Sequence, residues 1–296
     1  MIRSFIKEHN LEYLENVSLK KYNTYRLDTK ANYIVFPKNI DELILLLKFI
    51  KDNNIKYLIL GNGSNVIFKN NNYDGIIIKL TNLNNLEIDE TTIKVEAGYN
   101  LAKLSLETAN LSLTGLEFAS AIPGEVGAST AMNAGAYNSS MKDVVTRVKV
   151  LTPSLEIVTM ENKELEYSYR HSFFKDHKDF IILETELELE NGDKDDILEL
   201  IRTRRERRIE AQPLNYPSAG SVFRNPKDLH AGALIEQCGF KGYSINGLEV
   251  SEKHANFIIN KDNGTGEDIV KLINIIEEKV KEKYNIDLIL EQEIIE

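Results

Sequence analysis

The sequence has few of the features that mark several common classes of protein. Its 296 residues include a single cysteine, Cys238, which excludes an internal disulfide framework and favours a reducing compartment. No apolar run reaches the ~18 residues needed to span a bilayer. The N-terminal stretch MIRSFIKEHNLEYLEN also lacks the apolar core and cleavage site of a signal peptide. We therefore expect a cytoplasmic protein without a membrane partner.

Positive charge is scarce as well. The chain has 36 basic and 46 acidic residues, which gives a net charge of −10. A protein that binds a duplex needs a basic surface to replace the phosphate counterions, so we do not expect nucleic acid as a partner. A small anionic ligand is compatible with this charge, because it needs only a local cationic pocket. The five histidines show no metal-ligand spacing, and no metal site is expected.

The pattern of apolar residues predicts a mixed chain of helices and strands. Asn39 is placed to cap a helix that carries Leu43, Leu46 and Ile50 on one face. Thr265, with Asp268 three residues later, predicts the start of a second amphipathic helix. Further helices are expected at 101–111, 195–210 and 231–239, hairpins at 87–98 and 144–160, and strands at 31–36, 180–190 and 287–295.

Two glycine-rich segments are the first candidates for a ligand site. In LGNGSNVIF (60–68), the turn can aim backbone N–H groups at a phosphate; the alternative is a tight hairpin turn. It is not a dinucleotide-binding fingerprint, because Val66 stands where the third glycine should be. The run GLEFASAIPGEVGASTAMNAGAY (115–137) is dense in small residues. It suits a close approach to a ligand, or alternatively tight packing of loops.

Three further segments carry polar side chains that could do chemistry. Arg170 in YSYRHSFF (167–174) could pair with a carboxylate or phosphate, or form a surface ion pair. Ser221 in AGSVFRNP (219–226) has no nucleophile-elbow motif around it, and no histidine lies close by in a known triad order. In LILEQEII (288–295), Glu291 and Glu293 would share one side of a strand, where a solvated face is the simpler interpretation.

In order along the chain, these segments resemble the UDP-N-acetylenolpyruvoylglucosamine reductase family, in its form without the extra substrate-capping insertion. The resemblance covers nearly the whole chain. Besides the segments quoted above, it is carried by NTYRLDTKA (23–31), QPLNYPSAGSVFRNP (212–226) and AGALIEQCGFKGYSINGLEVSEKHANFIIN (231–260).

The resemblance implies a fold and a division into domains. The fold would be α+β: an FAD-binding fold of the vanillyl-alcohol-oxidase type in two subdomains, followed by a C-terminal α+β substrate-binding domain. The subdomains would be 1–82, with or without the terminal strand 287–296, and 83–210, with the substrate-binding domain at 211–290.

The resemblance also implies an activity. FAD would be the cofactor and NADPH the hydride donor for reduction of the enolpyruvyl C=C of a nucleotide sugar, giving UDP-N-acetylmuramate for peptidoglycan. Arg170, Ser221 and Glu293 match the family's catalytic residues, with Ser221 as the proton donor, and Tyr169, Arg224 and Asn225 would hold the substrate. The cofactor would be lined by Gly61, Asn62, Gly63, Ser64, Asn65, Pro123, Gly124, Gly127, Ser129, Asn133, Ala134 and Gly135.

Two other functions are compatible with the sequence. One is a different FAD-dependent oxidase of the same superfamily, although such enzymes often tether the flavin through histidine or cysteine and neither flavin-facing segment contains a histidine. The other is a non-catalytic protein that binds a nucleotide sugar. No obligate protein partner is expected.

Overall fold

The computed structural model describes all residues from 1 to 296, and the chain forms two compact units. The first unit comprises residues 1–15, 33–61 and 75–206, and the second comprises 16–32, 62–74 and 207–296. The expected division at residue 82 falls within the first unit, and the three-domain scheme stays a prediction. No helix combines the length and apolar character needed to cross a membrane.

The elements follow one another as a mixture of helices and strands. The α-helices are α1 (Ile2–Glu8), α2 (Ile40–Asp52), α3 (Leu101–Asn110), α4 (Val126–Ala131), α5 (Phe173–Asp176), α6 (Lys194–Ala211), α7 (Ala231–Gln237) and α8 (Gly266–Tyr284). The strands are β1 (Glu12–Ser18), β2 (Lys30–Phe36), β3 (Tyr57–Ile59), β4 (Val66–Phe68), β5 (Asn72–Ile78), β6 (Leu86–Asp89), β7 (Thr92–Glu96), β8 (Leu113–Thr114), β9 (Gly135–Ala136), β10 (Ser139–Ser140), β11 (Val145–Leu151), β12 (Ile157–Glu161), β13 (Ile181–Glu188), β14 (Glu190–Asn191), β15 (Ser244–Ile245), β16 (Leu248–Val250), β17 (Ile258–Asn260) and β18 (Glu293–Ile295). Short 3₁₀ turns are η1 (Leu19–Lys21), η2 (Glu117–Ala119), η3 (Met141–Asp143) and η4 (Asn162–Glu164).

The first unit has one continuous hydrophobic core. A sheet with the strand order β1-β2-β5-β3 and an antiparallel sheet with the order β12-β11-β13-β7-β6 both contribute to it. Leu43 and Leu46 from α2 belong to the same buried cluster as Ile76 of β5, Val95 of β7 and Val148 of β11. The apolar stripe of α2 and the inward faces of the strands are buried in one cluster, which is the main core of the first unit.

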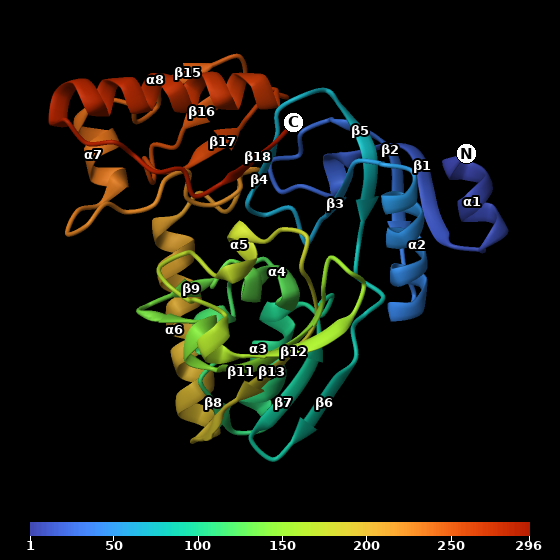
Figure 1. Cartoon of the computed structure of the whole chain (residues 1–296). Helices are drawn as coiled ribbons and strands as arrows, with labels where there is room; N and C mark the ends of the chain where they lie inside the picture. The colour runs from blue at the N-terminus through green and yellow to red at the C-terminus, as the bar shows by residue number, and fades with distance from the viewer. The chain divides into compact units, whose positions relative to one another are not determined.

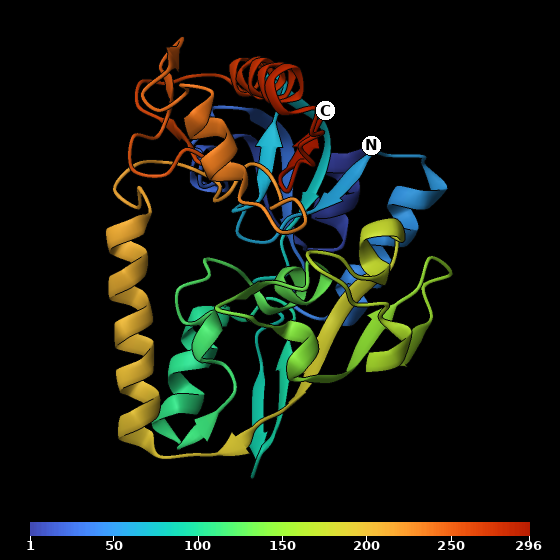
Figure 2. The same cartoon turned by 90° about the vertical axis from the view of Figure 1, so that its left-hand side faces the viewer.

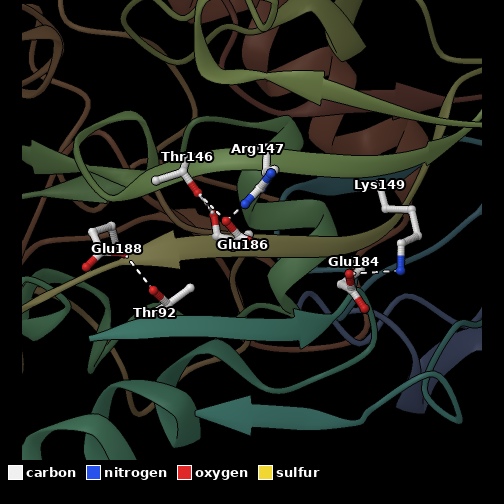
Figure 3. A network of polar contacts seen from close by, with 7 residues as sticks. All are labelled: Thr92, Thr146, Arg147, Lys149, Glu184, Glu186 and Glu188. Carbon is white, nitrogen blue, oxygen red and sulfur yellow. Dashed lines mark hydrogen bonds and ion pairs between the residues drawn. The ribbon is translucent and has the colours of Figure 1, made fainter. Parts of the chain in front are cut away.

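One face of the antiparallel sheet carries polar side chains in cross-strand pairs (Figure 3). Arg147 on β11 pairs with Glu186 on β13 at 2.7 Å, and Thr92 on β7 donates to Glu188 at 2.9 Å. On the other face of β13, Leu187 is fully buried. Polar pairs on a solvent-accessible face contribute little to stability, so the sheet is held mainly by its apolar face.

Helix α6 runs alongside α3 (Figure 2). Ile197 and Ile201 of α6 form a small buried cluster with Ala109 of α3. The other residues of α6 are mostly exposed and charged, and Arg202 pairs with Glu199 at 2.7 Å. The charged side chains of this helix therefore form a solvated, ion-paired face.

The second unit joins segments from three parts of the chain. Its antiparallel sheet has the order β15-β16-β17, and α8 contacts α7 and β4 (Figure 1). Strand β18, near the C-terminus, pairs in parallel with β4, with Glu293 opposite Val66. This pairing places the end of the chain beside the segment that follows the first glycine-rich loop.

Most of the predicted elements are confirmed. Asn39 accepts a hydrogen bond from the backbone N–H of Glu42, and Thr265 with Asp268 forms a capping box at the start of α8. Helix α4 was not predicted, because its residues are small and lack an apolar stripe. The strand expected over 287–295 was too long: only the last three of those residues, β18, are a strand.

Candidate active site

The loop 61–65 links two strands that are not partners. Strand β3 pairs with β5, whereas β4 pairs with β18, so the hairpin-turn interpretation of this segment is wrong. Gly63 has a φ of +64°, and a Cβ at this position would lie 2.2 Å from the carbonyl oxygen of Tyr22. The same segment is tied by a hydrogen bond from the N–H of Thr24 to the Gly63 carbonyl at 3.1 Å. Only glycine can turn the chain so close to this neighbouring backbone.

The small-residue run forms a turn and then helix α4. A Cβ on Gly127 would lie 2.6 Å from the Cβ of Ala97, and one on Gly124 would lie 2.6 Å from the hydroxyl of Ser129. A Cβ on Gly135 would lie 2.4 Å from the Ser139 carbonyl. Tight packing therefore explains these three glycines by itself, and their contact with a cofactor stays a prediction.

A buried ion pair links the loop to the start of α4. Lys79, in the segment after β5, donates to the carbonyl oxygen of Gly61 at 2.6 Å and to the carboxylate of Glu125 at 2.8 Å. Both side chains are almost fully buried. Burial raises the pKa of Glu125, and the positive charge of Lys79 opposes that rise. A Cβ on Gly61 would also lie 2.8 Å from the Cβ of Ala128, so the two glycine-rich segments approach closely at this point.

Asn133 connects the end of the small-residue run to the arginine loop. Its buried side chain donates to the carbonyl of Ser168 at 2.8 Å and accepts from the N–H of Lys142 at 3.0 Å. Because both ends of the amide are engaged within the protein, Asn133 positions the segment that carries Tyr169 and Arg170.

Arg170 lies in a tight turn. The backbones of Ser168 and His171 exchange two hydrogen bonds, at 3.1 and 3.2 Å, so Tyr169 and Arg170 form the tip. Arg170 has a φ of +56° in the left-handed region, and its guanidinium carbon lies 5.5 Å from the centre of the Tyr169 ring. The nearby Tyr167 hydroxyl is buried without a hydrogen-bond partner. Such a group costs about 1–3 kcal/mol unless something satisfies it, as a bound ligand would.

Ser221 follows a left-handed glycine in the second unit. Gly220 has a φ of +76°, and the N–H of Val222 donates to the carbonyl of Asn256 at 2.9 Å. The carbonyl of Val222 accepts from the N–H of Glu291 at 2.8 Å. The serine segment is thus paired with the chain just before β18.

Glu293 begins β18 and is tied to the glycine-rich loop. Its N–H donates to the carbonyl of Asn65 at 2.9 Å, while the Asn65 side chain donates to the carbonyl of Glu291 at 3.0 Å. The second unit therefore brings together the segments of three predicted site residues, Asn65, Ser221 and Glu293, whereas Arg170 belongs to the first unit.

A cavity of about 290 Å³ opens beside Ser221 within the second unit. Two lysines and two histidines contribute to its wall, and one carboxylate, Glu236, pairs with Lys241 at 2.8 Å. Burial is the main cause that lowers the pKa of His254, so its imidazole is neutral at neutral pH. The lining residues are Ser221, Asn225, His230, Gly232, Ala233, Glu236, Lys241, Lys253, His254, Ala255 and Asn256.

The two other predicted substrate residues beside the serine have distinct environments. Asn225 lines the cavity, and its side-chain oxygen accepts from the N–H of Ala231 at 3.1 Å. Arg224 is half-buried, and its Nε atom is buried without a hydrogen-bond partner. Sequence reasoning did not single out Lys241 and Lys253, although both lie in the segment 231–260 that carries the resemblance.

Comparisons with known proteins define the class. Residues 31–161 match the family model described as FAD binding domain, and residues 212–295 match the C-terminal domain of UDP-N-acetylenolpyruvoylglucosamine reductase. The chain is also similar to glucooligosaccharide oxidase from Acremonium strictum, with a TM-score of 0.52 at 14% identity over 94% of this chain and 58% of that one, a likeness of fold alone. The fold is α+β, an FAD-binding fold with a C-terminal α+β domain, and the protein is an FAD-dependent oxidoreductase.

The relatives define the family. The chain is 41% identical to UDP-N-acetylenolpyruvoylglucosamine reductase from Caldanaerobacter subterraneus over 99% of this chain and 96% of that protein. It is 39% identical to the enzyme of that name from Lactobacillus helveticus, covering 98% and 97%. The crystal structure of the reductase from Thermus caldophilus matches with a TM-score of 0.81 at 28% identity, over 96% of this chain and 98% of that one. The chain belongs to the UDP-N-acetylenolpyruvoylglucosamine reductase family.

Proposed function

We propose that the chain reduces UDP-N-acetylenolpyruvoylglucosamine with NADPH, and that Ser221 delivers the proton that completes the reaction. One observation carries this proposal. The N–H of Glu291 donates to the carbonyl of Val222, and this bond holds the segment that contains Ser221 beside the segment that contains Glu293. FAD, when held by the two glycine-rich segments, would supply the hydride chemistry that links NADPH to the enolpyruvyl double bond.

Ser221 suits the role of an acid rather than a nucleophile. Its segment has no nucleophile-elbow motif, and the two histidines that line the cavity beside it, His230 and His254, follow it along the chain in no known triad order. Reduction of the double bond leaves negative charge on the carbon next to the carboxylate. That carbon is far more basic than an alkoxide at neutral pH, so a serine hydroxyl within hydrogen-bond reach can protonate it.

Arg170 and Glu293 are proposed to stabilise the developing charge. The fixed positive charge of Arg170 would face the substrate carboxylate, where donors arranged in advance are worth more than in water. Glu293 would act together with Arg170 at the same group. The left-handed backbone of Arg170, with its φ of +56°, supports a special placement of this side chain, because non-glycine residues adopt it at a cost.

The proposed cofactor residues are those of the two glycine-rich segments and the turn that follows them. Residues 61–65 would hold the FAD pyrophosphate, and Pro123, Gly124, Gly127, Ser129 and residues 133–135 would line the rest of the cofactor. The buried Tyr167 hydroxyl without a partner supports a polar ligand in the first unit.

The cavity beside Ser221 is proposed to hold part of the nucleotide sugar. Its two lysines, Lys241 and Lys253, suit a diphosphate, since the protein as a whole is acidic and a local cationic wall is needed. Asn225 contributes to the same wall, and the unpartnered Nε of Arg224 supports a further anionic contact. Tyr169 completes the proposed substrate residues. The cytoplasm is the proposed compartment, which the single cysteine supports.

A spectrum and a coupled assay test the proposal. We expect the purified protein to show flavin absorbance, and to oxidise NADPH only when UDP-N-acetylenolpyruvoylglucosamine is present. Turnover of an alcohol or sugar with oxygen, independent of NADPH, would instead identify an oxidase. Binding of the nucleotide sugar with no NADPH oxidation would identify a binding protein and would equally contradict the proposal.

A further inference from the structure

A glutamine lies between the two carboxylates of the terminal segment. Gln292 is only 3% exposed, whereas the flanking Glu291 and Glu293 are both half-buried. A buried amide is costly unless its N–H and carbonyl groups find partners, so the contacts of Gln292 show what the position does.

The amide N–H groups of Gln292 face a row of backbone carbonyls. They donate to the carbonyl oxygens of Ala219 at 3.1 Å, Gly220 at 3.2 Å and Ser221 at 3.3 Å. The left-handed φ of Gly220 shapes this turn. One side chain therefore holds three successive peptide groups, ending at the residue proposed to deliver the proton.

Tyr25 determines which way round the amide sits. Its hydroxyl donates to the Gln292 oxygen at 3.0 Å, and the tyrosine is fully buried. Because burial raises the pKa of Tyr25, the hydroxyl keeps its proton and stays a donor. With a donor fixed on the oxygen side, only one orientation of the amide satisfies both the tyrosine and the carbonyls.

The backbone after Ser221 has its own supports. The side chain of Asn256 accepts from the N–H of Phe223 at 3.0 Å and donates to its carbonyl at 2.8 Å. The N–H of Arg224 donates to the carbonyl of Ile289 at 2.8 Å. The path of residues 222–224 is thus held by groups other than Gln292. The hydrogen bonds that the Gln292 side chain donates all go to the turn that presents Ser221.

We propose that Gln292, oriented by Tyr25, is a positioning residue that aims the Ser221 hydroxyl at the substrate. The inference rests on the proposed role of Ser221 as the proton donor. It predicts that loss of the amide slows the transfer of reducing equivalents from flavin to substrate and leaves the earlier steps unchanged. Misplacing a reacting group by about 1 Å can cost about 100-fold in rate.

Half-reaction kinetics on the FAD-loaded protein test the proposal. Gln292→Met keeps the length of the side chain and removes its hydrogen bonds. We expect reoxidation of the reduced flavin by the enolpyruvyl substrate to slow about 100-fold, with reduction by NADPH within about twofold of the unchanged protein. Tyr25→Phe should slow reoxidation less, by about tenfold, and it keeps the test open if Gln292→Met folds poorly. The FAD dissociation constant, measured by flavin fluorescence, should not change in either variant.

A double variant separates positioning of Ser221 from general damage. If Gln292 acts through Ser221, adding Gln292→Met to Ser221→Ala should slow reoxidation by less than about twofold. Full additivity would overturn the proposal, as would equal losses in both half-reactions or weaker FAD binding. Thr265→Ala, which removes the α8 cap elsewhere in the second unit, is the control for lost stability and should leave both half-reactions unchanged.

The outcomes also separate this inference from the proposed function. If Ser221→Ala leaves reoxidation unchanged, the proposed role of Ser221 fails, and slowing by Gln292→Met would then act through some other group. If Ser221→Ala slows reoxidation and Gln292→Met does not, the role of Ser221 stands and the positioning proposal alone is overturned.

Discussion

Single buried polar residues hold the segments of the site in place. Lys79 and Glu125 illustrate this, because their ion pair is almost fully buried and also binds the carbonyl of Gly61. An intact buried pair adds little net stability, since desolvation offsets the attraction. Removing one partner is different, because it leaves a charge in the interior without compensation.

Lys79→Met should destabilise the protein by about 3–5 kcal/mol near neutral pH. The carboxyl of Glu125 would lose the cation that opposes the rise of its pKa, so the pKa would rise further above its usual range. A carboxyl whose pKa is higher in the folded than in the unfolded state destabilises the fold increasingly as pH rises through that interval. Urea unfolding should therefore show a smaller deficit at about pH 5 than at about pH 8.

The control for this prediction is the double variant Lys79→Met with Glu125→Leu. It removes both charges, so much of the lost stability should return and the pH dependence of the deficit should disappear. A deficit of Lys79→Met that is the same at both pH values would show that the charge of Glu125 is not its cause.

Two glycines with left-handed backbones allow the cost of backbone strain to be measured apart from the cost of a steric clash. Gly63 and Gly220 both have positive φ, but a Cβ on Gly63 would lie 2.2 Å from the Tyr22 carbonyl, whereas nothing lies within 4 Å of one on Gly220. Gly220→Ala should cost about 1–2 kcal/mol for the left-handed backbone alone. Gly63→Ala should cost clearly more in thermal or urea unfolding, and equal costs would contradict the close packing of this loop.

For single residues, the sequence predicted the candidate catalytic side chains but not the buried polar residues that hold their segments in place. Serine, arginine and glutamate were identified through motifs, whereas Lys79 and Glu125 are 46 positions apart and Tyr25 and Gln292 are 267 apart. Contacts over such separations depend on how strands and loops meet, which local patterns do not encode. A charged residue inside a charge-poor run, such as Glu125, was the one available signal.

Helix caps could be predicted from the sequence more readily than strand pairings. Both predicted caps, Asn39 and Thr265, are confirmed, because an N-cap is a short-range interaction between neighbouring residues. Helix α4 was not predicted, because its six residues, VGASTA, show no amphipathic periodicity and form a helix through tertiary packing. Strand β18 is shorter than the apolar run suggested, since it exists only where β4 offers a partner.

Thr265→Ala should lower the free energy of unfolding by about 1 kcal/mol, because the capping box satisfies backbone N–H groups at the start of α8. Glu278→Ala, at an exposed position on the same helix, is the matched control and should change stability by less than about 0.5 kcal/mol. Calorimetry of both variants checks the prediction. Equal effects would indicate that the cap does not contribute.

In the molecule as a whole, segments that are far apart in the sequence fold into the same unit. The second unit collects residues 16–32, 62–74 and 207–296, so the loop at Asn65, the turn at Ser221 and the terminal Glu293 share one body. Motif order along the chain identified the family, but it did not reveal that Asn65 binds the backbone on either side of Gln292. Such grouping results from long-range strand pairing, which a single sequence leaves open.

The central claim is that Ser221 gives a proton to the substrate after hydride transfer. Stopped-flow measurement of the two half-reactions of Ser221→Ala tests it most directly. We predict that NADPH reduces the flavin at a rate within about twofold of the unchanged protein, while reoxidation by UDP-N-acetylenolpyruvoylglucosamine falls by at least about 100-fold, the contribution of a positioned acid. Equal losses in both half-reactions, or normal reoxidation, would contradict the claim.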